Sequence, residues 1–175
     1  MSSPEIIIRP AQPEDAEGIR DFLRETIVAE TQYVISLPEE LILDGERQKA
    51  WIIEYEKNDD AIMVVAVTDE RKIVGVLDFK PFPRKRLSHS GEFGISVRPG
   101  YQGAGIGQRI LVFFLKWAAQ REQITKINLS VFASNTRAIH IYEKYGFVKE
   151  GLQKNAVRMS EGVYEDLWLM TLLLK

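Results

Sequence analysis

The sequence predicts an α/β (α+β) protein in which a mixed sheet carries helices on both faces. Short runs of β-branched or apolar residues recur along the chain, and each run is typical of a strand. Amphipathic segments with a helical period lie between some of these runs. Several strands come first, and strands then alternate with helices, which is the order expected of a sheet with helices packed against it.

One strand and two helices are expected before residue 60. Residues 6–8 are a β-branched run that predicts the first strand. Pro13 and the two acids after it open a helix, because proline suits the first turn and acids complement the helix N-terminus. Residues 38–57 predict a second helix, and its apolar side chains are mixed with charges. We therefore expect this second helix to lie on the surface.

The remaining elements follow from apolar runs and from the residues that end them. Residues 61–67 are continuously apolar, as expected of a strand that is covered on both faces. Gly146 ends the last helix in a position that favours a left-handed cap. Strands are expected at residues 61–67, 73–79, 92–97, 127–132, 147–152 and 164–174, and helices at 105–121 and 136–145.

Composition limits the class of protein. A chain of 175 residues, with 45% hydrophobic and 27% charged residues, fits one globular domain over residues 1–175. The net charge of -2 gives no reason to expect nucleic acid or an anionic membrane as a partner. The chain has no cysteine and 2 histidines, which argues against a metal site.

We also find no targeting signal in the sequence. Met1 to Glu5 lack the basic and then apolar order of a signal peptide. The most apolar helical stretch, residues 106–119, is interrupted by Arg109 and Lys116 and is too short to span a bilayer. A cytoplasmic protein without a membrane partner is the default expectation.

A glycine-rich turn between a strand and a long helix is the most informative segment. Its glycines allow a tight turn, and the helix N-terminus adds partial positive charge, so the turn suits a phosphate or pyrophosphate. A Walker loop requires a glycine–lysine–hydroxyl ending that this chain lacks. A dinucleotide fingerprint requires a glycine where Gln108 or Ile110 stands, and the following strand lacks a terminal acid. Both nucleotide interpretations fail.

Two segments resemble the GNAT superfamily of N-acetyltransferases. Gln102, Gly105 and Gly107 match that family's acyl-CoA pyrophosphate signature. Residues 135–147, which run Asn-Thr-Arg-Ala-Ile-His-Ile-Tyr-Glu-Lys-Tyr-Gly-Phe, resemble its second characteristic segment and follow after one helix and one strand. The resemblance covers most of the chain and implies a mostly antiparallel central sheet with helices on both faces.

The resemblance also implies an acetyl-CoA site. The strand residues Ile95, Ser96 and Val97 would pair with the pantetheine arm. Asn135 resembles the family's cofactor-contacting asparagine, and it could equally be a helix cap. The pyrophosphate would be held by backbone amides of Gln102, Gly103, Ala104, Gly105, Ile106 and Gly107.

Two residues are candidates for proton transfer. Tyr142 stands where the family's general acid lies and would protonate the departing thiolate, although a tyrosine here could simply pack. Glu92 is the candidate base, on the strand face of Gly94 and Ser96. A surface glutamate is the alternative for Glu92, and a bulge would move it to the other face.

These features predict an N-acetyltransferase that moves an acetyl group from acetyl-CoA to a primary amine by direct attack. The acceptor could be an amino acid, a polyamine, an antibiotic or a protein N-terminus, and residues 30–57 and 152–162 are expected to select it. The alternative is a non-catalytic acyl-CoA-binding sensor or interaction module. Tyr142 and Glu92 favour catalysis, because a pure binder needs neither. A homodimer is left open.

Overall fold

The computed structural model describes residues 5–29, 32–41 and 44–174, and the chain forms two compact units. The first unit comprises Met1–Lys80 and Gly94–Arg121, and the second comprises Pro81–Phe93 and Glu122–Lys175. Strand β4 (Ser90–Val97) contributes residues to both units. The expectation of a single domain stays a prediction.

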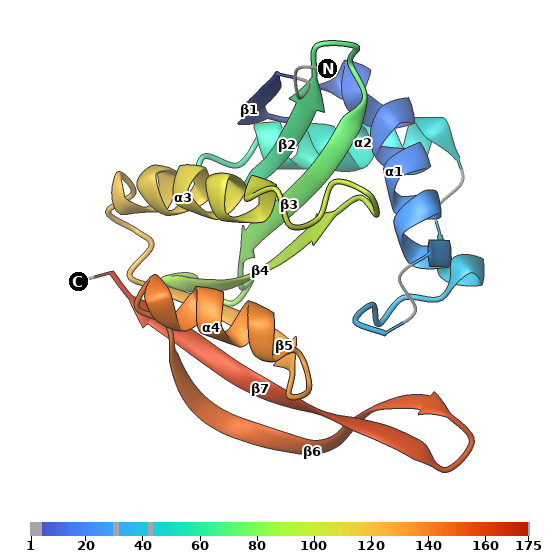
Figure 1. Cartoon of the computed structure of the whole chain (residues 1–175). Coiled ribbons are helices and arrows are strands. Elements are labelled where there is room, and N and C mark those ends of the chain that lie inside the picture. Colours follow the sequence, from blue (N-terminus) through green and yellow to red (C-terminus); the bar gives the residue numbers. More distant parts are fainter. Residues whose placement is uncertain (1–4, 30–31, 42–43, 175) are drawn as a thin grey trace. The chain divides into compact units, whose positions relative to one another are not determined.

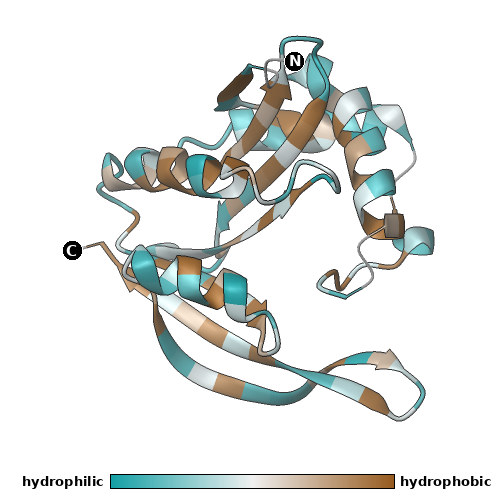
Figure 2. Ribbon diagram, viewed as in Figure 1, coloured by the Kyte–Doolittle hydropathy of each residue, from teal (hydrophilic) through white to brown (hydrophobic). Residues whose placement is uncertain are grey.

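The sheet of the first unit follows the order β1-β2-β3-β4. β1 (Ile6–Pro10), β2 (Ile62–Thr68) and β3 (Ile73–Pro81) are joined by antiparallel pairing. Every residue of β2 is buried, as its continuous apolar run predicts, and the strand is mostly brown in Figure 2. The predicted burial on both faces is confirmed.

Helices cover both faces of this sheet. α1 (Ala16–Ala29) and α2 (Gly45–Glu56) share a core with Met63 and Val65 of β2. α3 (Ile106–Ala119) covers the opposite face and lies in front of β2 and β3 in Figure 1. A Cβ on Gly75 would lie 2.6 Å from Ile110 Cδ1 of α3, so glycine permits this close approach.

The second predicted helix differs from the structure in extent and in burial. Residues 38–57 contain a short 3-10 turn, Pro38–Glu40, and then α2. Asp44 caps α2, since its Oδ1 accepts a bond of 3.0 Å from the amide of Glu46. The expected surface position is wrong for one face, because Ile52 and Tyr55 are buried. Gln48, Ile52 and Tyr55 share helical spacing, and this buried stripe is hidden in the sequence by the polar residue within it and by intervening charges.

The second unit contains the first half of β4, then β5 (Lys126–Phe132), β7 (Val163–Leu173) and β6 (Val148–Ser160), in that order across its sheet. β4 and β5 are parallel, whereas β5–β7 and β6–β7 are antiparallel. α4 (Thr136–Lys144) belongs to this unit and is followed by Gly146, whose φ of 90° confirms the predicted left-handed cap. The predicted mixed, mostly antiparallel sheet is thus confirmed.

β6 is longer than the sequence predicts. The expected strand at residues 147–152 continues to Ser160, and β6 and β7 form a long hairpin that turns at Gly162 (Figure 1). Asn155 has a φ of 51°, and its amide donates to Asp166 Oδ1 at 2.7 Å. Irregular register and mostly exposed side chains hide this strand from a pattern search.

Candidate active site

The turn after β4 is built from glycines in the left-handed region. Gly100, Gly103 and Gly105 have φ values of 86°, 86° and 77°. A Cβ at Gly100 or Gly105 would meet nothing within 4 Å, so the requirement for glycine here is conformational rather than steric. The turn from Gln102 to Gly105 is exposed, which leaves its backbone accessible to a ligand.

Arg98 fixes the start of this turn. Its amide donates to Val74 O at 2.8 Å, and its Nε donates to Ile73 O at 2.9 Å. The guanidinium also pairs with Glu25 of α1, and the residue is 4% exposed. The sequence suggested no role for Arg98, because a basic residue before a proline and a glycine looks like an ordinary loop position. The structure shows that it ties the turn to β3 and α1.

The turn leads directly into the N-terminus of α3. Gly105 is the N-cap and offers no side chain to the first helical amides. No acidic residue occupies the first turn, so the partial positive charge of the helix end is not offset there. Gln102 Nε2 donates to Val97 O at 3.1 Å, and a Cβ on Gly107 would lie 3.5 Å from Val97 Cγ2. The structure therefore brings the predicted pyrophosphate residues and the end of β4 together.

In the second unit, Tyr142 lies in a cluster of three aromatic rings. Its ring centroid is 5.9 Å from that of Phe93 and 5.9 Å from that of Phe147, in edge-on arrangements. The hydroxyl has no hydrogen-bond partner among the residues described. Burial raises the pKa of Tyr142 to about 12, so the phenol keeps its proton at neutral pH. Packing against Phe93 and Phe147 therefore orients the ring.

Glu92 lies on the other face of β4. Phe93 is buried against Tyr142, whereas Glu92 is exposed, as expected of neighbours along a strand. The predicted alternation therefore holds at these two residues. The candidate acid and the candidate base are on opposite faces of the strand.

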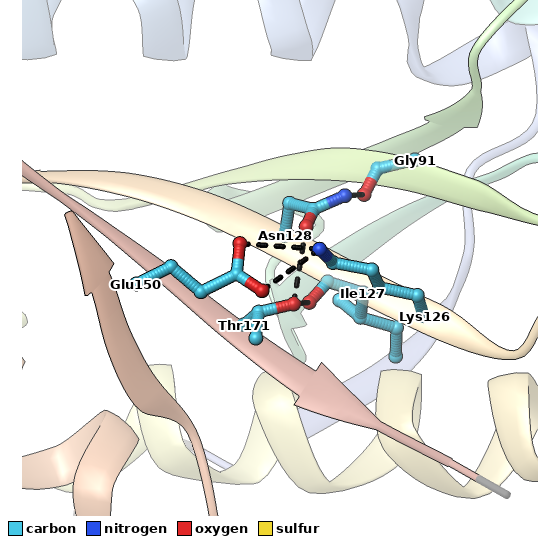
Figure 3. Close-up of polar contacts among 6 residues, drawn as sticks. All are labelled: Gly91, Lys126, Ile127, Asn128, Glu150 and Thr171. Carbon is cyan, nitrogen blue, oxygen red and sulfur yellow. Dashed lines mark hydrogen bonds and ion pairs between the residues drawn. The ribbon is translucent and has the colours of Figure 1, made fainter. Parts of the chain in front are cut away.

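A polar network holds β4 at this point (Figure 3). The parallel register joins Ser90, Gly91 and Glu92 to β5 and ends with the pair Glu92–Asn128. Asn128 Nδ2 donates to Gly91 O at 3.0 Å, and Thr171 Oγ1 lies 3.1 Å from both Asn128 Oδ1 and Ile127 O (Figure 3). The exposed pair Lys126–Glu150, at 2.9 Å, adds a link from β5 to β6. Sequence reasoning missed Asn128, because one polar residue in an apolar strand has no characteristic spacing.

Asn135 caps α4. Its Oδ1 accepts a hydrogen bond of 3.1 Å from the amide of Ala138, so the helix-cap role proposed for this residue is present. The bond uses the carbonyl oxygen and leaves the side-chain NH2 group as a donor. A contact with cofactor stays a prediction.

Two further properties concern the described part of the chain. It contains no group of three or more histidine, aspartate or glutamate side chains placed to hold a metal ion. None of its helices is both long enough and apolar enough to cross a membrane.

Comparison with known proteins shows the family to which the chain is similar. Residues 23–147 match the model of the Acetyltransferase (GNAT) family. The L-amino acid N-acetyltransferase AaaT of Escherichia coli is 28% identical over 95% of this chain and 96% of its own length. A GNAT-family acetyltransferase from Streptococcus pneumoniae superposes with a TM-score of 0.91 at 30% identity, over 97% of this chain and 99% of that one.

A third protein shares the fold at lower identity. The structure of yncA from Salmonella typhimurium with its cofactor acetyl-CoA has a TM-score of 0.84 at 19% identity, covering 98% of this chain and 95% of that one.

Proposed function

Since this chain belongs to the GNAT acetyltransferase family, we propose that it transfers an acetyl group from acetyl-CoA to a primary amine. The observation that carries the proposal is the exposed glycine turn that leads into an uncapped helix N-terminus. Backbone amides in such a turn bind phosphate without a lysine or a metal. A turn without a lysine or a metal matches the pyrophosphate of coenzyme A better than the phosphates of a nucleoside triphosphate.

The cofactor-binding residues follow from this turn. Backbone amides between Gln102 and Gly107 would hold the pyrophosphate. The register of β4 with β5 ends at Glu92, so the backbone of Ile95–Val97 is the segment that we assign to the pantetheine arm. The NH2 group of Asn135 is a further donor for the cofactor. The residues present fit the ligand.

In the reaction, the amine nitrogen forms a bond to the thioester carbonyl carbon, and the carbon–sulfur bond breaks. The departing thiolate needs a proton, and we propose that Tyr142 donates it. The phenol is protonated at neutral pH and its hydroxyl is not engaged by the described residues. A thiol has an ordinary pKa near 8.5, which is below the pKa of the phenol, so the proton transfer needs a thiolate that is kept away from water. Removal of water increases the basicity of the thiolate. The aromatic cluster around Tyr142 provides such an environment.

The amine must lose a proton, because its ordinary pKa is about 10.4. We assign this proton to Glu92, directly or through water. Glu92 and Tyr142 on opposite faces of β4 would let the amine approach from one side while the thiolate leaves toward the other.

The Glu92→Gln variant should lose kcat/KM most at neutral pH, and the deficit should shrink as the pH rises toward the amine pKa. A pH–rate profile parallel to that of wild type would assign the proton to water instead.

The acceptor is a primary amine, and an L-amino acid is the first candidate, because the similar Escherichia coli protein is named for that substrate. The exposed hairpin end at residues 152–162 and the segment around α2 stay the candidates for substrate selection.

The proposal is tested by release of free thiol from acetyl-CoA. The assay would contain acetyl-CoA and a panel of the L-amino acids, spermidine and an alanine-terminated peptide. Amine-dependent thiol release and a matching acetylated product are the expected result. If coenzyme A raises the melting temperature and no amine is acetylated, the chain is a non-catalytic acyl-CoA-binding module.

A further inference from the structure

A carboxylate and a phenol that the proposed mechanism does not use meet in the first unit. Asp78 of β3 accepts a hydrogen bond of 3.1 Å from the Tyr55 hydroxyl of α2. Tyr55 is 6% exposed and packs edge-on against Trp51, with ring centroids 5.7 Å apart, so the hydroxyl is held in place. Asp78 pairs with Met63 in the strand register and therefore lies on the sheet face of α1 and α2.

The charge of Asp78 is not balanced by a cation. Tyr55 supplies the one side-chain hydrogen bond to Asp78 among the described residues. The nearby Lys80 is paired with Glu54 at 3.1 Å, and its Nζ lies 5.4 Å from the centre of the Tyr55 ring. Burial raises the pKa of Asp78 despite the hydrogen bond from Tyr55, as expected of a carboxylate without a cation beside it. A cationic ligand would supply that compensation.

Gly94 leaves space beside this carboxylate. A Cβ built on Gly94 would lie 3.5 Å from Asp78 Oδ1, at ordinary contact distance, and Gly94 itself is exposed. Any larger side chain at Gly94 would cover the oxygen that Tyr55 does not bind. Gly94 directly precedes Ile95–Val97, the segment assigned to the pantetheine arm. The open carboxylate therefore lies beside the strand along which we place the acyl donor.

We propose that Asp78, oriented by Tyr55 and left uncovered by Gly94, binds an ammonium group of the acceptor amine. This inference rests on the proposed function. An amine that reaches the site at neutral pH carries a positive charge, and a partly buried carboxylate attracts it more strongly than an exposed one. Asp78 thus selects for cationic acceptors, and Tyr55 acts as a positioning residue.

The ammonium group that Asp78 binds is one of two groups. It is either the reacting amine before deprotonation or a second cationic group of a polyamine. Every L-amino acid except lysine carries one ammonium group at most, and spermidine carries several. If the effect of Asp78 appears only with spermidine, the subsite binds the second group.

The test compares Asp78→Asn with Glu150→Gln. Both variants remove one negative charge, but Glu150 is an exposed residue paired with Lys126 and lies outside the segments assigned to substrate selection. Asp78→Asn should raise the KM of the best acceptor about tenfold or more, the size expected for a charge-assisted hydrogen bond. Its kcat should change much less, and the stabilisation by coenzyme A should be that of wild type. Glu150→Gln should leave KM within about twofold of wild type.

Gly94→Ala provides a steric test that leaves the carboxylate in place. The added methyl group should raise KM for the acceptor while the melting temperature changes little, because its nearest neighbour is at ordinary contact distance. Binding is also measured without turnover, as the rise in melting temperature that spermidine or an L-amino acid causes in the coenzyme A complex. Asp78→Asn should abolish this rise.

Two outcomes separate the proposals. If wild type acetylates amines and Asp78→Asn keeps both its KM and its amine-induced stabilisation, the subsite is wrong and the enzyme assignment stands. If no amine is acetylated but amines stabilise wild type and not Asp78→Asn, the subsite stands and the proposed reaction fails.

Discussion

At the scale of single residues, burial sets the chemistry of Tyr142. The phenol packs against two phenylalanine rings that also contact each other, and burial raises its pKa to about 12. A residue with this environment is protonated over the physiological range and releases its proton only to a strongly basic partner. Burial thus keeps the phenol in the protonated form that a general acid needs, and it also makes the proton harder to release.

Tyr142→Phe removes the hydroxyl and keeps the ring in the aromatic cluster. We expect folding and coenzyme A binding to survive and kcat to fall by about 10²-fold or more, since general acid catalysis typically contributes that much. Steady-state kinetics and thermal melts with coenzyme A would measure the two effects. A kcat near that of wild type would assign Tyr142 to packing alone.

Asp78 makes stability depend on pH. Its folded-state pKa is raised above the unfolded value, so its contribution to stability is full below that unfolded value, about 3.9, and is lost as pH rises through the folded pKa. The melting temperature of Asp78→Asn relative to wild type should therefore increase from pH 4 to pH 7. A difference that is constant over this range would show that Asp78 is fully compensated in the folded protein. Loss of amine binding together with this gain in stability would indicate a functional residue.

At the scale of elements, the junction of β4 and α3 forms the turn to which we assign pyrophosphate binding. Three left-handed glycines reverse the chain, Arg98 fixes the start of the turn to β3, and the helix begins without a side-chain cap. The sequence motif indicates the glycines, whereas the anchoring by Arg98 depends on strands and helices that are distant in sequence. The start of β4 is similarly held by Asn128, which donates to Gly91 from the neighbouring strand.

A pair of substitutions at Gly105 separates charge from bulk. Asparagine and aspartate have similar size and both tolerate a positive φ, but only aspartate adds negative charge. Gly105→Asp should abolish the rise in melting temperature that coenzyme A causes, and Gly105→Asn should retain most of it. Thermal melts at several coenzyme A concentrations would measure this. Equal stabilisation of Gly105→Asp and wild type would place the pyrophosphate elsewhere.

At the scale of the whole molecule, β4 runs through both compact units. Phe93 belongs to one unit and Gly94 to the other, so neither unit has a complete sheet without this strand. The proposed cofactor segment and the proposed ammonium subsite belong to the first unit, and Glu92, Asn135 and Tyr142 belong to the second. If the chain is one domain, its two units should unfold together.

The chain should unfold in a single cooperative transition. Loss of β4 from one unit removes it from the other, which couples the two. Thermal unfolding followed by far-ultraviolet and near-ultraviolet circular dichroism should give the same midpoint. Two separate midpoints would show that the units are independent domains.

The sequence by itself determined the order of most elements and the position of the glycine turn to which we assign pyrophosphate binding. Both depend on local information: the continuous apolar run of β2, the helical period of α3, and glycines where the backbone needs a positive φ. Local pattern was insufficient for α2 and β6. Charges obscured the buried stripe of α2, and β6 has irregular pairing and little burial.

Only the tertiary structure decided which polar groups meet. Asp78 and Tyr55 are 23 residues apart, and Asn128 and Gly91 are 37 apart. Such contacts leave no periodic signal, because the energy that forms them comes from packing of the elements that carry them. The sequence thus indicated the family and its acyl donor, whereas the environment of Tyr142 and the open carboxylate of Asp78 emerged only when strands and helices packed.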